Sequence, residues 1–158
     1  MMKCLHSGHG DSSSGYRRGM VQRATALSER ARRFLLEPRG AVLGTLNPDR
    51  SPHLTVIWYE LREDEIVFNT TASRVKARNL SRDPRASILV GDMSIYVRID
   101  GRGREVASGG DALEDIRRLA IRYDGPEAAE RQVREVWSKQ DRVTYALSIE
   151  RVYEYGLE

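Results

Sequence analysis

A chain of 158 residues suits one domain with one core, and a hydrophobic fraction of 40% with a charged fraction of 31% is typical of an ordinary globular protein. The net charge of +3 is small, its arginines mostly lie beside acids, and no apolar run approaches the ~20 residues of a membrane span. Composition therefore argues against nucleic-acid and membrane partners, and we expect a cytoplasmic protein.

The first residues predict a tail. Residues 1–19 are rich in Ser, Gly and His and lack the apolar segment of a secretory signal, so we predict a disordered tail before a domain over residues 20–158. The tail holds Cys4, the only cysteine, which excludes a disulfide framework. Cys4, His6 and His9 could suggest a metal site, but three ligands on a flexible segment fix no coordination geometry, so we expect no metal.

The domain then alternates strands and helices. Ser28 is a plausible N-cap for a helix over residues 29–36. Apolar and β-branched runs separated by turn residues indicate strands, and the periodicity indicates three further helices, of which the first two are capped by Ser73 and Asp111. The expected strands are 41–46, 53–59, 66–70, 86–91, 96–106 and 143–149, and the expected helices are 73–80, 111–124 and 127–139.

This order of elements decides the fold class. The first three strands are closely spaced and read as an antiparallel meander, and strands and helices do not alternate in the manner of a parallel sheet. Gly101 and Gly103 lie inside a strand, which is typical of a bulge or a bend at a barrel corner. We therefore predict a mainly β (α+β) fold, a small six-stranded antiparallel barrel with peripheral helices.

The most informative segment surrounds the helix after the third strand. The start of a helix attracts anions, yet here Ser73 is followed by the cations Arg74 and Lys76, which oppose the helix dipole. A bound phosphate would compensate them, and Asn79 lies on the same face as Lys76. The alternative interpretation is a solvated basic helix whose arginines pair with Asp83 and nearby acids.

The segment over residues 70–87, with its string Lys76-Ala77-Arg78-Asn79-Leu80 followed by Arg82-Asp83-Pro84-Arg85, resembles the phosphate-binding segment of the pyridoxamine-5′-phosphate-oxidase-like flavoproteins. More narrowly, it is similar to the actinobacterial branch that uses the deazaflavin coenzyme F-420. Gly44-Thr45-Leu46, the turn before His53 and the pair Trp58-Tyr59 fit the same pattern.

The resemblance implies a split β-barrel of the FMN-binding type, a homodimer, and a tricyclic cofactor ring across the second and third strands. It implies that Arg74 and Lys76 bind the cofactor phosphate with help from Ser73 and Asn79. The residues that it places around the ring are His53, Thr55, Val56, Asn69 and Thr70, with Ser94, Ile95 and Tyr96 approaching from the partner chain.

The activity implied is that of a coenzyme F-420-dependent oxidoreductase that transfers a hydride to an unsaturated small organic substrate. Two alternatives stay open: an FMN-binding oxidase or reductase of the same family, and a non-catalytic flavin-binding or carrier protein. No catalytic residue is assigned, and the proton donor is water or a side chain such as Tyr96 or His53. The C-terminal residues 150–158 lack the Trp/Arg/His-rich substrate motif of true pyridoxamine phosphate oxidases, so the resemblance does not extend to that substrate.

Overall fold

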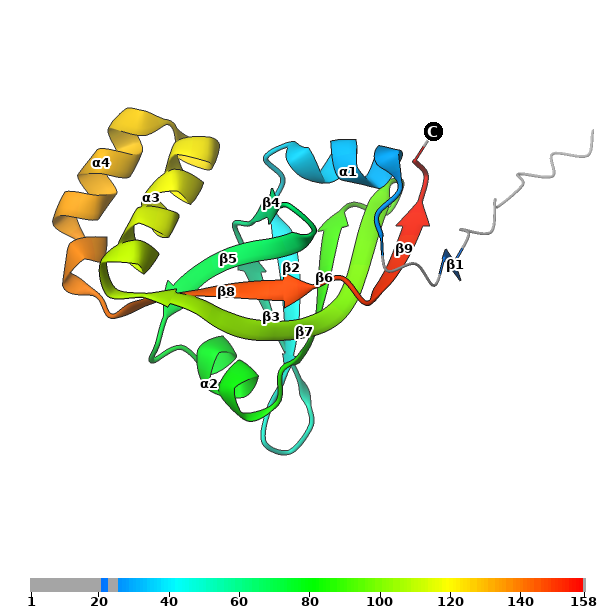
Figure 1. The fold of residues 1–158 in the computed structure, drawn as a ribbon, viewed down its shortest axis with the longest axis horizontal. Coiled ribbons are helices and arrows are strands. Elements are labelled where there is room, and N and C mark those ends of the chain that lie inside the picture. The colour runs from blue at the N-terminus through cyan, green and yellow to red at the C-terminus, as the bar shows by residue number, and fades with distance from the viewer. Residues whose placement is uncertain (1–20, 23–25, 158) are drawn as a thin grey trace, which may run out of the picture.

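The computed structural model describes residues 21–22 and 26–157 (Figure 1). The predicted tail 1–19, with Cys4, His6 and His9, lies outside the described residues. The helices are α1 (Glu29–Leu36), α2 (Val75–Arg82), α3 (Gly109–Asp124) and α4 (Pro126–Glu135), followed by a 3-10 turn at Trp137–Lys139. The strands are β1 (Val21–Gln22), β2 (Ala41–Leu46), β3 (Pro52–Ile57), β4 (Glu60–Arg62), β5 (Glu65–Thr71), β6 (Arg85–Gly91), β7 (Tyr96–Ser108), β8 (Arg142–Ser148) and β9 (Arg151–Tyr155).

The strands form one antiparallel sheet that curls on itself. Its order is β3-β2-β6-β7-β8-β5-β4, with β9 paired to β7 and to β1. The two end strands, β3 and β4, are joined directly by Trp58 and Tyr59, so the sheet closes into a barrel that is split between them. The predicted fold class, an antiparallel split barrel with peripheral helices, is confirmed.

The strand count exceeds the six that the sequence predicted. All six expected strands are present, and β1, β4 and β9 are additional. The sequence predicts no strand after residue 149. In the structure β9 forms there, pairs with β1 and β7, and buries Val152 against the core.

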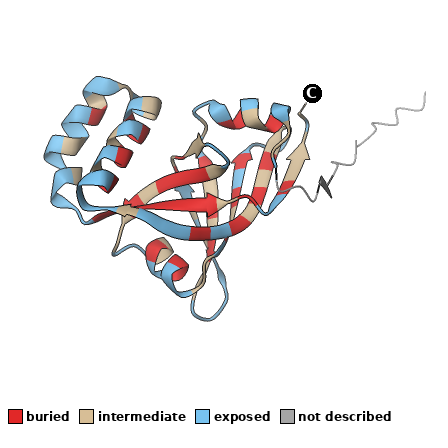
Figure 2. Ribbon diagram, viewed as in Figure 1, coloured by how far each residue is buried: buried red, intermediate tan, exposed pale blue. Residues whose placement is uncertain are grey.

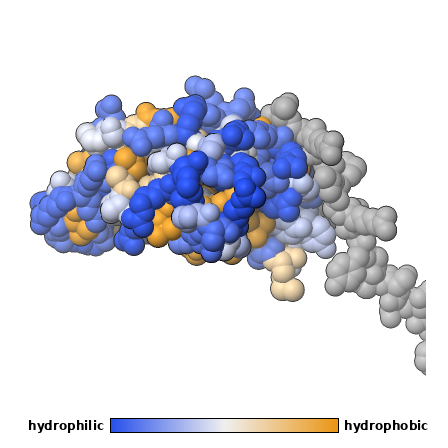
Figure 3. Space-filling model, turned by 90° about the horizontal axis from the view of Figure 1, so that it is seen from below, coloured by the Kyte–Doolittle hydropathy of each residue, from blue (hydrophilic) through white to orange (hydrophobic). Residues whose placement is uncertain are grey.

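Buried side chains line the inside of the curled sheet and the helix faces turned toward it (Figure 2). Strand β8 is buried along nearly its whole length, because one of its faces lies inside the barrel and the other lies under α3. No helix of the described part of the chain is long and apolar enough to cross a membrane. The face seen from below is mostly hydrophilic, with apolar patches among the charged side chains (Figure 3).

The helix termini differ in part from the predictions. Ser28 caps α1 as expected, since its hydroxyl accepts a hydrogen bond from the Ala31 N–H at 3.0 Å. Ser73 does not cap α2, because the N-cap position falls on Arg74. Helix α3 begins at Gly109, which places Asp111 in the first turn instead of at the cap, and the predicted helix 127–139 is divided into α4 and the 3-10 turn.

The long strand β7 links the two halves of the barrel, and its glycines lie at the crossover (Figure 1). Residues before Gly103 pair with β6 and β9, whereas residues from Gly103 onward pair with β8. A Cβ atom on Gly101 would lie 1.8 Å from the Ser148 carbonyl oxygen, and one on Gly103 would lie 2.9 Å from Leu80. The fixed backbone oxygen therefore requires glycine at position 101, whereas at position 103 a Cβ would displace the end of the Leu80 side chain.

We predict that Gly101→Ala lowers the free energy of unfolding by at least about 3 kcal/mol, because the added methyl group overlaps a backbone oxygen that cannot move independently. Gly110→Ala in α3 is the matched control: nothing lies within 4 Å of its Cβ position, so we expect no loss and a gain of up to about 1 kcal/mol. Urea titration followed by circular dichroism measures both. Equal stability of Gly101→Ala and the wild type would contradict the crossover geometry.

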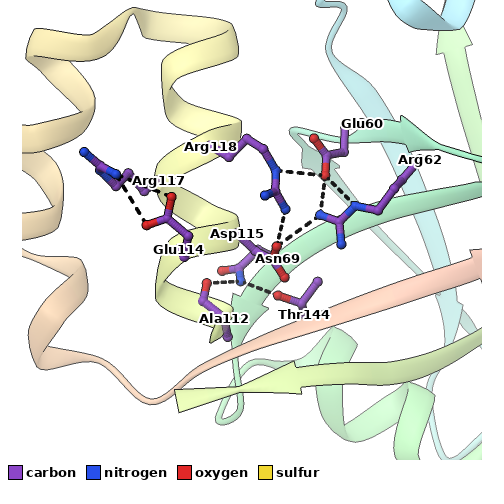
Figure 4. Close-up of polar contacts among 9 residues, drawn as sticks. All are labelled: Glu60, Arg62, Asn69, Ala112, Glu114, Asp115, Arg117, Arg118 and Thr144. Atoms are coloured by element: carbon purple, nitrogen blue, oxygen red, sulfur yellow. Dashed lines mark hydrogen bonds and ion pairs between the residues drawn. The ribbon is translucent and has the colours of Figure 1, made fainter. Parts of the chain in front are cut away.

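The α3–α4 hairpin is anchored on the barrel by a buried carboxylate (Figure 4). Asp115 on α3 is 7% exposed and binds Arg62 of β4 at 3.0 Å and Arg118 of its own helix. Glu60 accepts from the same two arginines. Burial alone lowers the pKa of Arg62, but its bonds to Glu60 and Asp115 outweigh burial and raise that pKa. The carboxylates and guanidinium groups therefore neutralise one another where α3 meets β4.

We predict that Asp115→Ala destabilises the protein by about 2 kcal/mol, because Arg62 and Arg118 lose the more buried of the two carboxylates that they share and keep only Glu60. The neighbouring Glu114→Ala removes the same charge from the same helix but breaks only an exposed pair with Arg117, so we expect a loss below about 1 kcal/mol. The two variants are compared by thermal unfolding, and similar losses in both would argue against the anchor.

Candidate functional site

Helix α2 begins without a side-chain cap and without acidic residues in its first turn. Arg74 occupies the N-cap position and its side chain makes no capping hydrogen bond. Ser73 is exposed, and its carbonyl oxygen accepts a bond from the Arg78 guanidinium at 2.6 Å. The Ala77 N–H donates to the Arg74 carbonyl oxygen at 3.1 Å, whereas the N–H groups of Val75 and Lys76 have no partner among the described residues. These two groups and the positive end of the helix dipole can therefore receive an anion.

Three cations gather beside this helix start. Burial, followed by repulsion from Arg74 and Arg142, lowers the pKa of Lys76. Burial also lowers the pKa of Arg142 to about 10, with a further contribution from Arg74, so Arg142 stays charged at neutral pH. None of the three takes part in an ion pair with another described residue. Arg74 is exposed, Lys76 is half-buried and Arg142 is buried. Cations that repel one another, with no acid of the described residues between them, form a site that an anion would stabilise.

Sequence reasoning missed Arg142. It is 9% exposed at the first position of β8, where it pairs in register with Thr71 of β5. Its guanidinium binds the side-chain oxygens of Asn69 at 2.8 Å and Gln140 at 2.7 Å. A single arginine at the start of an apolar strand reads as an exposed end residue, so only the pairing of β5 with β8 reveals its position.

Asn69 and Thr70 point to opposite faces of β5. Asn69 turns toward α3, where its Nδ2 donates to the Ala112 carbonyl oxygen at 2.8 Å and to Thr144 at 2.9 Å (Figure 4). Thr70 is 5% exposed and faces the barrel interior. Contact of either residue with a cofactor ring stays a prediction, and for Asn69 the backbone is the part left open to such contact.

Asn79 joins α2 to the end of β2. Its side chain is 1% exposed, and its Nδ2 donates to Thr45 and Asn47 at 3.1 Å each. Its Oδ1 accepts from Arg82 at 3.0 Å. The structure thus gives Asn79 an internal role that fixes how α2 lies on the barrel, and its predicted help in phosphate binding stays a prediction.

The split in the barrel leaves two unpaired backbone edges. Among the described strands, β3 pairs only with β2, and β4 covers β5 only as far as Val67, so no described strand pairs with that side of β5 from Phe68 onward. His53 and Thr55 of β3 are half-buried and share the face of Ile57, whereas Val56 points outward and is 75% exposed. The Thr55 hydroxyl is buried and has no hydrogen-bond partner among the described residues, so a bound polar group could satisfy it.

The remaining predicted residues lie at the other end of the barrel. Ser94, Ile95 and Tyr96 connect β6 to β7, next to Gly91, whereas α2 leads into the opposite end of β6 at Arg85. The intervening strand spans about 20 Å. One chain therefore brings together Ser73, Arg74 and Lys76 but leaves residues 94–96 distant from them.

Two hollows lie near this region without including the cations. One, of about 380 Å³, lies behind α2 beside Ala77 and Tyr145. The other, of about 520 Å³, lies on the outer face of β2 and β6 between Leu54 and Arg85. The cation site is therefore an open surface beside the start of α2, and the described residues of one chain do not enclose it.

The chain is similar to known proteins over most of its length. Residues 27–156 match the family model described as pyridoxamine 5'-phosphate oxidase. A Mycobacterium tuberculosis protein named F420H(2)-dependent biliverdin reductase is 33% identical over 117 residues, which are 72% of this chain and 85% of that protein.

Solved structures agree with this match. A conserved hypothetical protein of M. tuberculosis superposes with a TM-score of 0.68 at 31% identity, over 85% of this chain and 88% of that one. A structure titled F420 reductase superposes with a TM-score of 0.63 at 23% identity, over 80% of this chain and 98% of that one, and shares the fold. With a family model that spans nearly all of the described residues and a curved split barrel to match, the chain belongs to the pyridoxamine 5'-phosphate oxidase family.

Proposed function

We propose that this chain is an oxidoreductase that binds coenzyme F-420 at the split of its barrel and transfers a hydride to an unsaturated small organic substrate. The observation that carries the proposal is the set of unpaired cations at the uncapped start of α2. It is supported by the 33% identity to a protein named for F420H(2)-dependent reduction. FMN offers a phosphate to the same cations, so an FMN-dependent oxidase or reductase is the alternative within the same site.

The chain's residues have separate tasks in this proposal. Arg74 and Lys76, with the hydroxyl of Ser73 and the free N–H groups of α2, bind the phosphate. His53, Thr55 and Val56 border the ring on one side of the split, and the backbone edge at Asn69 and Thr70 borders it on the other. When bound, the deazaflavin supplies the hydride, while the protein fixes the distance and angle to the substrate.

The α3–α4 hairpin supplies an aromatic wall near the end of the split. Trp58, which links β3 to β4, stacks on Tyr123 with ring centres 5.3 Å apart and meets Trp137 edge-on at 6.4 Å. Each of these rings is only half-buried. We propose that the substrate lies against this wall, because a planar unsaturated molecule packs well on aromatic faces.

The proposed active form is a homodimer. Strands β3 and β6 expose Leu54 (65%), Val56 (75%) and Leu89 (40%) on the outer face of the sheet. These apolar side chains, on the two strands that flank β2, form a face that a second copy would cover, and that copy would bring its residues Ser94, Ile95 and Tyr96 to the open site. The partner would then exclude water from the ring.

We predict that the double variant Arg74→Gln, Lys76→Gln weakens binding of coenzyme F-420 by at least about a hundredfold, since each charge-assisted bond contributes about 1.5–3 kcal/mol. Fluorescence titration of the coenzyme measures the dissociation constant. Arg78→Gln removes a cation from the same helix, and its side chain points back to the Ser73 carbonyl, so we expect a change below threefold. Equal losses in the two variants, or none, would refute the phosphate assignment.

The same titration has a pH dependence. The anion favours the charged form of Lys76, whose pKa is lowered by burial and by its cationic neighbours. We therefore expect the affinity for the coenzyme to be constant at neutral pH and to fall in the alkaline range as Lys76 loses its proton. This fall should begin at a lower pH than the deprotonation of an ordinary lysine. The single variant Lys76→Gln should lose this fall, and an unchanged pH profile would exclude Lys76 from the site.

We predict a dimeric mass for the wild type by light scattering and a monomeric mass for Leu54→Glu, which places a charge in the proposed interface. Ile121→Glu is the control, because this residue is 40% exposed on α3, away from that face, and should remain dimeric. A monomeric wild type at micromolar concentration, with full coenzyme affinity, would contradict the dimer. Tight binding without turnover by any substrate tested would favour the carrier alternative.

A further inference from the structure

Arg142 is a buried cation with only neutral partners. Its guanidinium binds the amide oxygens of Asn69 and Gln140, and the described residues place no carboxylate on it. A charge that is 91% buried is costly unless an opposite charge or strong polar contacts compensate it. Amide oxygens offset only part of the cost of burying this charge. A nearby anion would therefore stabilise Arg142.

The surroundings of Arg142 indicate that an anion bound to it would lie on the side of α2. The ring of Trp137 lies 5.9 Å from the guanidinium carbon, so an aromatic face occupies one side. Arg142 pairs in register with Thr71, and the Ala72 N–H donates to the Asp141 carbonyl oxygen at 3.0 Å, so the start of β8 lies beside the turn that leads into α2. Repulsion from Arg74 contributes to lowering the pKa of Arg142. Neighbouring cations that repel one another are stabilised when an anion binds between them.

Asn69 holds Arg142 in this place, and all the hydrogen-bonding positions of the Asn69 amide are in use. Both donors are used, one on the Ala112 carbonyl oxygen in the first turns of α3 and one on Thr144. Its oxygen accepts from two nitrogens of the Arg142 guanidinium. An amide that is saturated in this way fixes the geometry of whatever it binds.

We propose that Arg142 is the third cation of the anion site at α2, and that Asn69 is the positioning residue that holds it there and ties the site to the α3–α4 hairpin. The inference rests on the proposed function for the identity of the ligand, a phosphate-bearing cofactor. It assigns to β8 a binding residue that lies far from α2 in the sequence, and it gives the hairpin a part in cofactor affinity.

The test compares four variants of the full chain. Arg142→Gln removes the charge, and Arg142→Lys keeps it without the forked geometry. Asn69→Asp is nearly isosteric and supplies a carboxylate that neutralises Arg142 in place. Arg134→Gln is the control, since this residue is 71% exposed on α4 and gives the same change in net charge. Thermal melting of each variant is recorded with the binding data.

The probes are coenzyme F-420, FMN, the phosphate-free deazaflavin that corresponds to F-420, and inorganic pyrophosphate. Pyrophosphate binding is followed by tryptophan fluorescence, because Trp137 lies against Arg142. We expect Arg142→Gln and Asn69→Asp to weaken coenzyme and pyrophosphate binding by about tenfold to a hundredfold, with no change for the phosphate-free compound. The affinity of Arg142→Lys should fall between those of the wild type and Arg142→Gln. Asn69→Asp should melt below the wild type, because its carboxylate cannot donate to the Ala112 carbonyl oxygen or to Thr144, so its affinities are measured well below its melting temperature.

The outcomes separate this inference from the proposed function. Unchanged pyrophosphate affinity in Arg142→Gln overturns the inference, as does an equal loss for the phosphate-free compound, which would indicate a purely structural role. A wild type that binds pyrophosphate through Arg142 but neither F-420 nor FMN supports the inference and refutes the proposed cofactor. A wild type that binds none of these ligands refutes both.

Discussion

The central feature of this structure is positive charge without a matching acid. Two other clusters of the chain pair arginines with acids: Asp115 and Glu60 share Arg62 and Arg118, and Asp83 binds Arg85. In the first of these clusters, partly buried guanidinium groups are neutralised by one buried and one half-buried carboxylate. At the start of α2 the same chain places exposed Arg74, half-buried Lys76 and buried Arg142 together, and the described residues provide no carboxylate. Because both arrangements occur in one molecule, the second is best understood as a site completed by a ligand.

The fold makes such a site possible by interrupting its own sheet. A closed barrel would pair every strand edge, but here β4 is short and β3 has one neighbour, so a length of β5 remains unpaired. Helix α2 follows this free stretch of β5 after a short turn, and Asn79 fixes the helix on the end of β2. The helix terminus therefore lies at one end of the split, in the position needed to hold the charged end of a molecule whose flat part lies between the strands.

The sequence predicted what is local and missed what depends on pairing. The fold class, Gly101 and Gly103 at the crossover, and the cations of Ser73-Arg74-Val75-Lys76 follow from short-range patterns, because turn chemistry and helix polarity are properties of adjacent residues. Arg142, which we propose as the third cation of the site, lies beside α2 only because β8 pairs with β5, a contact with no sequence signal. The predicted cap at Ser73 was wrong for a related reason. A serine before a helix indicates a cap only if no other contact sets where the helix begins. Here the Ala72 N–H, in the turn before α2, donates to the Asp141 carbonyl oxygen.

The same reasoning explains why residues on opposite ends of one chain can serve one site. Residues 94–96 lie at the far end of β6 from α2, and a strand does not shorten. In the proposed homodimer a second copy brings that loop to the cations of the first, and the apolar side chains that it would cover lie on β3, at the split, and on β6, beyond β2. In that proposal the start of α2 supplies the positive charge, the split supplies the space for the ring, and the partner covers the ring. Such a site would tie cofactor binding to assembly, because the cations are present in each chain and the closed pocket would form only in the dimer.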